Sequence, residues 1–318
     1  MTSSFDSNNF IDKWCRQLNT KIDGRVIVAV SGGIDSTVCA LLIKKTKILH
    51  NLLLIDTGFL RKGEVEKVQD NFKRVKCSID VIDAGDTFYD NVQGRSEFSE
   101  KREAFRKTYF SILTEYIKGK KAKYLLQGTQ FHLSNAKMYH NNPYPKKTRQ
   151  FKMLEPLAGL TKVQIRAIAR KLGIPSEIIK RQPFPGPGLL LRFSGAYSHH
   201  KLSVIRDITY LTEQFIEHHP YVFRDCYQVF PFLAGLEIPF VNLLSAGDHG
   251  PIVLMRIIKY KAGRKGIMYM PKILSETIQR KLVDELMQTN SIARVCFDAT
   301  PKYGQGGKSS PGGTIEYA

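Results

Sequence analysis

The sequence predicts an α/β fold, in which a doubly wound parallel sheet is followed by a smaller α+β domain. Strand-like and helix-like segments alternate through the first half of the chain, which is the order of βαβ units with parallel strands. A glycine-rich turn at 31–37 joins the first predicted strand to the first predicted helix. A proline- and glycine-rich segment at 182–189 interrupts regular structure and marks the end of the first domain.

The first domain is predicted from apolar runs separated by helical patterns. Residues 25–30 form a short run rich in β-branched side chains, which is typical of a buried strand. Similar runs predict three more strands, and segments with one apolar face predict the helices between them. The predicted strands are 25–30, 51–56, 77–82 and 123–127, and the predicted helices are 38–45 and segments near 63–75, 101–118 and 161–172.

The second domain begins with a long helical pattern and continues with apolar runs. Residues 198–218 have helical periodicity, and a second helix is predicted near 273–287. Predicted strands lie at 227–230, 252–258 and 293–297. We therefore expect two domains, 1–193 and 194–318.

The composition favours a globular enzyme and argues against several other classes. Of the 318 residues, 42% are hydrophobic and 24% are charged, which is ordinary for such a protein. Five scattered cysteines without a Cys-x-x-Cys pair argue against a zinc site or a disulfide framework. The N-terminus has no signal-peptide pattern, and no apolar run is long enough to span a bilayer. We expect a cytoplasmic protein with no membrane partner.

The formal net charge of +19 needs its own explanation. Short basic clusters occur at 118–123, 146–149 and 259–265. One explanation is a polyanionic partner such as RNA or a nucleotide. The other is a lysine-rich surface in contact with water, which we favour because the clusters are short and contain few aromatic residues. Nucleic acid is therefore not expected as a partner.

The turn Ser31-Gly32-Gly33-Ile34-Asp35-Ser36-Thr37 is predicted to bind phosphate. Backbone N–H groups and the positive end of the following helix converge there, and glycine lets an anion approach the backbone closely. The turn is not a Walker A loop, because Asp35 stands where that motif has its Lys. A carboxylate beside a phosphate indicates a bound Mg²⁺. The alternative is an ordinary strand–turn–helix junction.

Two more turns follow predicted strand ends, Asp56-Thr57-Gly58 and Gly128-Thr129. Ligands of doubly wound sheets bind at the carboxyl ends of the strands, so we expect one nucleotide site across these neighbouring turns. An Asp-Thr-Gly sequence is also common in purely structural turns. Its functional interpretation depends on its position one strand after the phosphate-binding turn.

The turn at 31–37 resembles the pyrophosphate loop of the ATP pyrophosphatase family, which has the form Ser-Gly-Gly-x-Asp-Ser/Thr. Further segments resemble motifs of the GMP synthetase family and follow in the same order. They are 56–62, Glu100-Lys101-Arg102, Gln127-Gly128-Thr129, 154–157, 184–189 and 314–317. The resemblance runs from about residue 25 to the C-terminus. It implies a sheet of the adenine-nucleotide alpha-hydrolase type in the first domain.

The resemblance also implies a reaction and its partners. The chain looks like the separate synthetase subunit of a two-subunit, glutamine-hydrolysing enzyme, because no glutaminase domain precedes the pyrophosphate loop. ATP with Mg²⁺ would adenylate the 2-oxygen of XMP and release pyrophosphate, and ammonia would then displace AMP to give GMP. The ammonia would come from a partner glutaminase subunit. The second domain would bind XMP and form a homodimer.

Residues that match the family's motifs receive expected roles from the resemblance. Asp35 and Lys137 are candidate catalytic residues, and Asp35 is also the candidate metal ligand; for Lys137 the alternative is a solvated surface position. The candidate nucleotide-binding residues are Ser31, Gly32, Gly33, Ile34, Asp35, Ser36, Thr37, Asp56, Gly128 and Thr129. The candidate XMP-binding residues are Arg102, Asp248, Lys308, Ile315 and Glu316.

The chain departs from the family pattern after Thr129. Residues 130–136 are shorter than the family's segment and lack its two carboxylates, and 139–144 do not repeat its His-His-Asn sequence. Two alternatives therefore stay open. One is a pyrophosphate-loop enzyme that modifies tRNA, which the positive charge favours and the absence of a catalytic Cys pair disfavours. The other is an ATP-binding homologue that has lost its activity.

Overall fold

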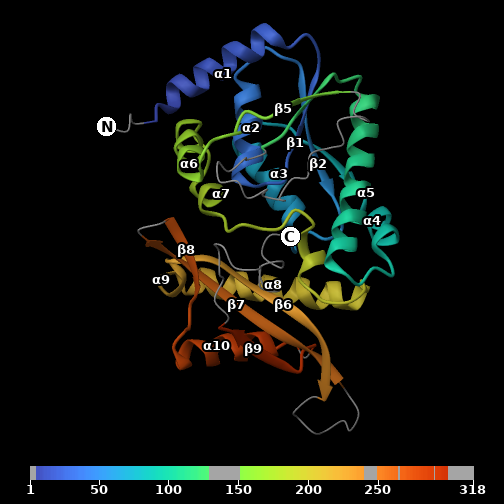
Figure 1. Ribbon diagram of the computed structural model, residues 1–318, viewed down its shortest axis with the longest axis vertical. Coiled ribbons are helices and arrows are strands. Elements are labelled where there is room, and N and C mark those ends of the chain that lie inside the picture. The colour runs from blue at the N-terminus through green and yellow to red at the C-terminus, as the bar shows by residue number, and fades with distance from the viewer. Residues whose placement is uncertain (1–4, 129–150, 240–248, 264–265, 290, 300–318) are drawn as a thin grey trace. The chain divides into compact units, whose positions relative to one another are not determined.

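The computed structural model describes residues 5–128, 151–239, 249–263, 266–289 and 291–299 (Figure 1). The chain separates into two compact units, and neither is one continuous stretch of sequence. The first unit consists of Met1–Gly58, Gly63–Gly85 and Lys107–Arg181, and the second of Phe59–Lys62, Asp86–Arg106 and Gln182–Ala318. The expected domains, 1–193 and 194–318, assumed continuous segments, and they stay a prediction about which segments fold independently.

A five-stranded parallel sheet forms the centre of the first unit. Its strands are β1 (Val26–Ala29), β2 (His50–Asp56), β3 (Asp80–Asp83), β4 (Tyr124–Leu126) and β5 (Lys152–Leu154). Their order is β3-β2-β1-β4-β5, so β1 pairs in parallel with both β2 and β4. The direction of winding reverses at β1, and ligands of doubly wound sheets bind at such a reversal. The predicted doubly wound parallel sheet is confirmed.

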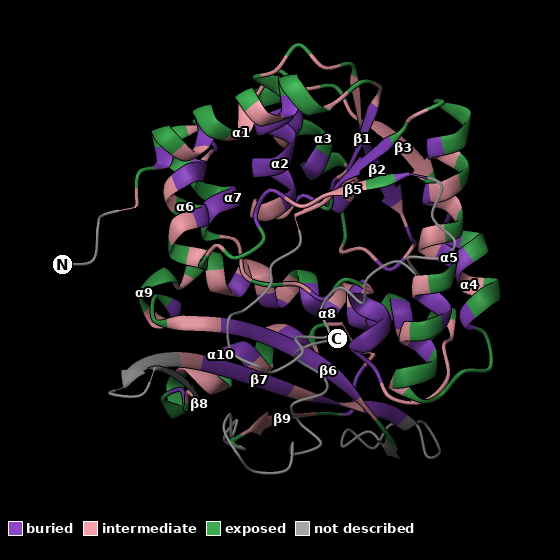
Figure 2. Cartoon of the chain, turned by 45° about the horizontal axis from the view of Figure 1, so that its top comes forward, coloured by how far each residue is buried: buried purple, intermediate pink, exposed green. Residues whose placement is uncertain are grey.

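Both faces of this sheet are buried, which explains why its strands are continuous apolar runs. Val28 and Leu52 lie in the core cluster on one face, whereas the alternate residues Ile27 and Leu53 are also almost fully buried. Strands covered on both sides lose the polar–apolar alternation of strands that face water. The burial is visible in Figure 2, where the inner strands and α2 are purple.

Helices flank the strands in the predicted order. Those wholly within the first unit are α1 (Ser7–Lys21), α2 (Ile34–Lys44), α3 (Glu64–Arg74), α6 (Lys162–Lys171) and α7 (Ser176–Lys180). Helices α4 (Gly85–Val92) and α5 (Phe98–Gly119) contain residues of both units. α2 follows β1 directly, is buried from Ser36 to Ile43, and packs against α1 and α6.

Four short or terminal elements of this part were not predicted from the sequence. β5 has three residues and is defined by its pairing with β4 rather than by an apolar pattern of its own. α1 begins at an Asp6 cap in a polar N-terminal segment, and α4 and α7 are short. Such elements depend on tertiary contacts more than on periodicity, because a short helix is marginal by itself.

The second unit contains a mixed sheet built around one long strand. Its strands are β6 (Cys226–Pro239), β7 (His249–Gly263), β8 (Gly266–Pro271) and β9 (Arg294–Asp298). β7 pairs antiparallel with β6 and β8 and parallel with β9. The remaining elements are α8 (His199–His218), α9 (Pro220–Phe223), α10 (Glu276–Met287) and a 3-10 helix, η2 (Gly188–Leu191). The expected α+β architecture is confirmed, and β8 is the strand that the sequence did not predict.

No helix within the described residues combines the length and apolar character that crossing a bilayer requires.

The proline–glycine segment packs closely at Gly188, inside the second unit. Gly188 has a φ of +63°, and a Cβ there would lie 2.3 Å from the carbonyl oxygen of Phe59. The same oxygen accepts a hydrogen bond of 2.8 Å from the N–H of Leu189. Both the left-handed conformation and the close approach therefore require glycine.

We expect Gly188→Ala to lower the free energy of unfolding by about 3 kcal/mol, because alanine adds backbone strain and a clash with a carbonyl. Gly186→Ala is the matched control, since nothing lies within 4 Å of a Cβ at that position. It should change the free energy by no more than about 0.5 kcal/mol. Urea unfolding of both variants tests this, and equal stabilities would contradict the close approach at Gly188.

Candidate functional site

The predicted phosphate-binding turn lies between the end of β1 and the first turn of α2. Gly32 has a φ of +70°, which glycine adopts without strain. The Oγ atom of Ser36 accepts a hydrogen bond from the N–H of Ser31 at 3.1 Å and donates to the carbonyl of Gly33 at 3.1 Å. The hydroxyl of Thr37 donates to the same carbonyl at 2.9 Å. These two hydroxyls therefore hold the turn in shape, while Ser31 is exposed.

The start of α2 offers backbone donors to an anion. Gly33 occupies the N-cap position and has no side chain to accept hydrogen bonds from the first helical amides, which begin at Ile34. The positive end of the helix dipole lies at the same point. This arrangement is what binding of a phosphate group requires, and the phosphate-binding role of 31–37 stays a prediction.

Gly128 brings the turn after β4 against α2. A Cβ at Gly128 would lie 2.8 Å from Cβ of Asp35 and 2.9 Å from its backbone carbonyl carbon. No side chain fits there unless Asp35 moves. The structure thus brings together two turns that the sequence assigned to one nucleotide site.

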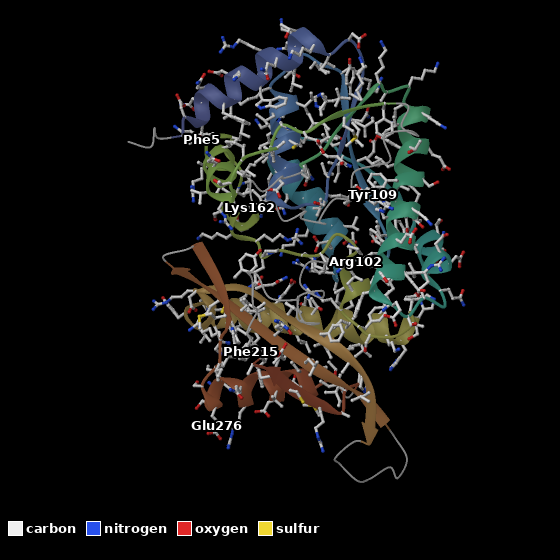
Figure 3. All side chains as sticks on the ribbon, in the orientation of Figure 1. Phe5, Arg102, Tyr109, Lys162, Phe215 and Glu276 are labelled. Carbon is white, nitrogen blue, oxygen red and sulfur yellow. The ribbon has the colours of Figure 1, made fainter. Side chains whose placement is uncertain are left out.

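Lys162 forms an ion pair with Asp35 (Figure 3). A capping box between Thr161 and Gln164 begins α6 and makes Lys162 its first residue. The Nζ atom of Lys162 lies 2.6 Å from Oδ2 of Asp35, and the two side chains are 44% and 27% exposed. Sequence reasoning missed Lys162. The capping box predicts where α6 begins, but nothing local indicates that its first side chain meets a residue far earlier in the chain.

The second oxygen of Asp35 suits a cation. Oδ1 is buried and accepts no hydrogen bond from the described residues. A buried carboxylate oxygen without a donor is costly, and a hard cation such as Mg²⁺ binds oxygen ligands of this kind. The described residues contain no group of three or more His, Cys, Asp or Glu side chains that would hold a metal alone. Mg²⁺ fits this pattern, because it is commonly held by one or two carboxylates together with substrate phosphates.

Asp56 lies at the end of β2, the strand beside β1. Its Oδ1 atom accepts a hydrogen bond of 2.9 Å from the N–H of Gly58, and its carbonyl accepts one of 2.9 Å from Ala84. The Asp56-Thr57-Gly58 turn is therefore a real Asx turn at the carboxyl edge of the sheet. Its structural role is visible, and its nucleotide-binding role stays a prediction.

Six of the expected site residues lie outside the described part of the chain. They are Thr129, Lys137, Asp248, Lys308, Ile315 and Glu316.

Arg102 belongs to the second unit, next to a lysine that is fully buried. Burial lowers the pKa of the half-buried Arg102 guanidinium. Lys101 is 0% exposed, and its Nζ atom donates to the carbonyl of Phe193 at 3.0 Å. The same atom lies 4.3 Å from the centre of the Phe193 ring and 5.4 Å from that of Phe98. Burial, followed by the charge of Lys201, lowers the pKa of Lys101 from 10.5 to about 8.

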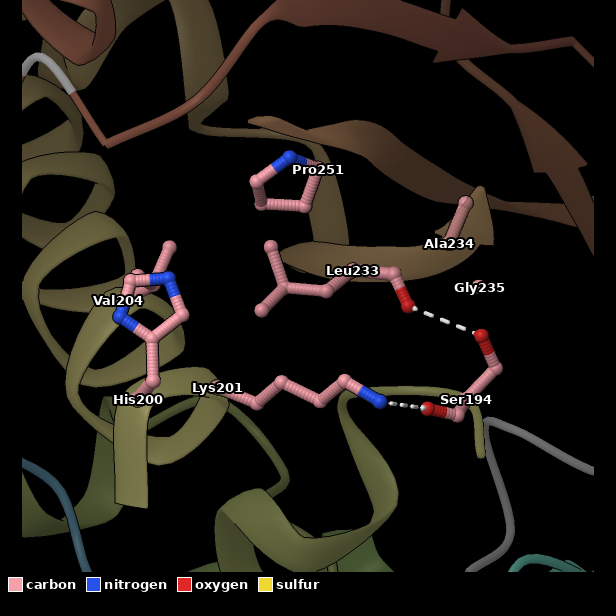
Figure 4. Close-up of a pocket in the computed structure, with 8 residues that line it drawn as sticks. All are labelled: Ser194, His200, Lys201, Val204, Leu233, Ala234, Gly235 and Pro251. Carbon is pink, nitrogen blue, oxygen red and sulfur yellow. Dashed lines mark hydrogen bonds between the residues drawn. The ribbon is translucent and has the colours of Figure 1, made fainter. Parts of the chain in front are cut away.

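A small cavity in the second unit does not offer a nucleotide site (Figure 4). It has a volume of about 30 Å³ and is lined by residues that include Ser194, Lys201 and Leu233. The Nζ atom of Lys201 turns to the carbonyls of Ser194 and Ala196, at 3.5 and 3.3 Å. Such a space holds one or two water molecules, so the phosphate loop remains the better candidate site.

The sequence resembles known proteins over its whole length. The profile of the NAD synthase family matches residues 6–187. The B subunit of the glutamine-hydrolysing GMP synthase of Thermoplasma volcanium is 34% identical over 327 aligned positions, which cover 98% of this chain and 99% of that protein. Its counterpart of the same name in Methanocella arvoryzae is 31% identical, also over 98% and 99%. That of Sulfurisphaera tokodaii is 41% identical over 224 positions, or 66% of this chain and 60% of the relative.

We expect Gly128→Ala to weaken the binding of Mg²⁺-pyrophosphate at least about tenfold, because its Cβ displaces the backbone of Asp35. Gly119→Ala, at the end of α5, is the control, since a Cβ there has nothing within 4 Å. Isothermal titration calorimetry measures both affinities. Equal affinities would separate Gly128 from the anion site.

The buried Lys101 predicts a pH dependence of stability. Its pKa of about 8 in the folded chain lies below its ordinary value of 10.5, so the unfolded chain binds more protons between these values. The free energy of unfolding therefore rises with pH across this window, by up to about 1.4 kcal/mol per pH unit.

Lys101→Met should remove this increase, whereas Lys118→Met, on the exposed end of the same helix, should keep it. Urea unfolding between pH 7.5 and about 10 tests the difference. Parallel pH profiles for wild type and Lys101→Met would show that the ammonium is not desolvated.

Proposed function

The chain belongs to the family of glutamine-hydrolysing GMP synthase B subunits, and from that premise we propose that it aminates XMP to GMP with ATP. The observation that carries the proposal is the turn between β1 and α2, where backbone amides, Asp35 and Lys162 meet. The family uses ATP through a pyrophosphate loop, and this turn has the donors that a pyrophosphate group needs.

In the proposed reaction, the 2-oxygen of XMP attacks the α-phosphorus of ATP. The bond between that phosphorus and the bridging oxygen of the β-phosphate breaks, and pyrophosphate leaves with the electron pair. Ammonia then attacks C2 of the adenylated purine, AMP leaves, and GMP forms after the loss of a proton. The chain contributes by orienting the two nucleotides and by stabilising the charge that grows on pyrophosphate.

Asp35 and Lys162 have complementary roles in this proposal. The Lys162 ammonium offsets the Asp35 carboxylate when no nucleotide is bound, since their charged atoms lie 2.6 Å apart. With ATP bound, the same ammonium is positioned beside the turn to neutralise the leaving pyrophosphate. Lys162 is therefore a candidate catalytic residue in addition to those expected from the sequence.

Mg²⁺ belongs to the proposal because the buried Oδ1 atom of Asp35 lacks a donor among the described residues. When bound there together with the nucleotide, Mg²⁺ supplies positive charge to the phosphate oxygens.

The remaining expected roles are part of the same proposal. Lys137 and Thr129 would act near the phosphates, and Asp56 at the edge of β2. Arg102, Asp248, Lys308, Ile315 and Glu316 would bind XMP, as the motif matches imply.

The assembly is the second part of the proposal. The relatives are named as one of two kinds of subunit, which implies a partner glutaminase that would supply ammonia. We also propose a homodimer through the second unit and a cytoplasmic location, which the free state of all five cysteines supports.

The decisive experiment measures pyrophosphate release by the purified chain with Mg²⁺-ATP and ammonium, with and without XMP. We expect XMP-dependent release with formation of AMP and GMP. Release without XMP, or its dependence on tRNA instead of XMP, would contradict the proposal.

Asp35→Asn should lower the rate of XMP-dependent pyrophosphate release by at least about 100-fold, because it removes the charge that holds the cation and pairs with Lys162. Asp70→Asn, on the exposed face of α3, is the control and should keep the wild-type rate. Unchanged turnover of Asp35→Asn would remove this residue from the reaction.

A further inference from the structure

One arginine joins the phosphate loop to helix α3. Arg181 is the residue after α7, and its Nη1 atom donates to the carbonyl of Gly32 at 3.2 Å. Its Nη2 atom donates to Oε1 of Glu64, the first residue of α3. The Arg181 side chain is 16% exposed and that of Glu64 is 4% exposed. We call these three residues the Arg181 brace.

The same part of α3 touches the loop directly. Val68 lies one helical turn after Glu64, on the same face of α3, and is 0% exposed. A Cβ on Gly32 would lie 2.3 Å from Cγ2 of Val68 and 3.1 Å from Nη1 of Arg181. Gly32 is therefore enclosed by an apolar side chain and a guanidinium, and its peptide group has little freedom to rotate.

The position of the Gly32 carbonyl determines where a neighbouring donor points. The carbonyl of Gly32 and the N–H of Gly33 belong to one peptide group, which is trans in this chain. In a trans peptide the two groups point in opposite directions. A guanidinium that holds the carbonyl therefore directs the Gly33 N–H away from Arg181. A Cβ at Gly33 would meet only the Oγ atom of Ser31, so the loop is open at this residue.

We propose that Arg181 is a positioning residue that presets the backbone donor of the phosphate loop for pyrophosphate. It acts through the Gly32 carbonyl, and Glu64 orients the guanidinium. The inference rests on the proposed function of the loop and adds two residues to it that the motif matches did not contain.

The chemistry of the brace requires arginine. A planar guanidinium donates from separate nitrogens to two acceptors at once, whereas a lysine ammonium acts as a single point charge on a flexible chain. A buried ion pair contributes little net stability by itself, because burial of both charges is costly. A role in orienting the loop explains why this pair also donates to a loop carbonyl.

The test compares two ligands by isothermal titration calorimetry, which requires no turnover. Mg²⁺-pyrophosphate probes the loop, and AMP probes the rest of the nucleotide site. We expect Arg181→Lys and the charge-free double variant Arg181→Gln/Glu64→Gln to weaken pyrophosphate binding by about tenfold, the loss of one charge-assisted contact. The affinity for AMP should stay within about twofold of wild type.

Tyr116→Phe is the matched control for a loss of stability within the same unit. It removes the hydrogen bond from Tyr116 to Asp80, which does not involve the loop. It should lower the melting temperature and leave both affinities at their wild-type values.

The outcomes separate the two proposals. Wild-type affinity for pyrophosphate in both brace variants would overturn the positioning role, as would an equal loss of pyrophosphate and AMP binding. If the double variant does not fold, Arg181→Lys alone decides, because it keeps the buried charge balanced. Failure of wild type to make GMP would contradict the proposed function and leave the pyrophosphate comparison valid.

Discussion

Close backbone packing around the first turn of α2 is the constraint on which the first unit depends. Gly32 fits against Val68, and Gly128 fits against Asp35, at distances where any Cβ would force the backbone apart. The loop is therefore held by contact on two sides, from α3 and from the turn after β4. Amide donors preset in this way need no reorganisation when an anion binds, which is the physical basis of strong anion binding by backbone groups.

Charge is balanced locally around this loop. Asp35 lies in the first turn of α2 and Glu64 in the first turn of α3, where a helix dipole stabilises negative charge. Each carboxylate pairs with a cation from a later segment, Lys162 or Arg181. The more exposed pair, Asp35 with Lys162, can rearrange around a ligand at lower cost than the buried one, because water compensates separated charges.

The second unit solves a different problem, since it buries a lysine beside aromatic rings. Lys101 donates to the carbonyl of Phe193 and lies over its ring, so its charge is compensated by dipoles and not by a carboxylate. This arrangement makes the unit sensitive to pH near the lowered pKa of Lys101. Its long central strand, β7, collects β6, β8 and β9 into one sheet, and the tight turn at Gly188 begins η2.

The sequence by itself determined the strand and helix order of the first unit, the phosphate-binding turn and the family, because apolar periodicity and short motifs are local properties of the chain. Only the tertiary structure revealed the partners of Asp35 and of Gly32. Lys162 is 127 residues from Asp35 in sequence, and Arg181 is 149 residues from Gly32. Three-residue β5 likewise exists only through its pairing with β4. Such contacts arise when distant segments pack against one sheet, and no local pattern of residues records which side chains then meet.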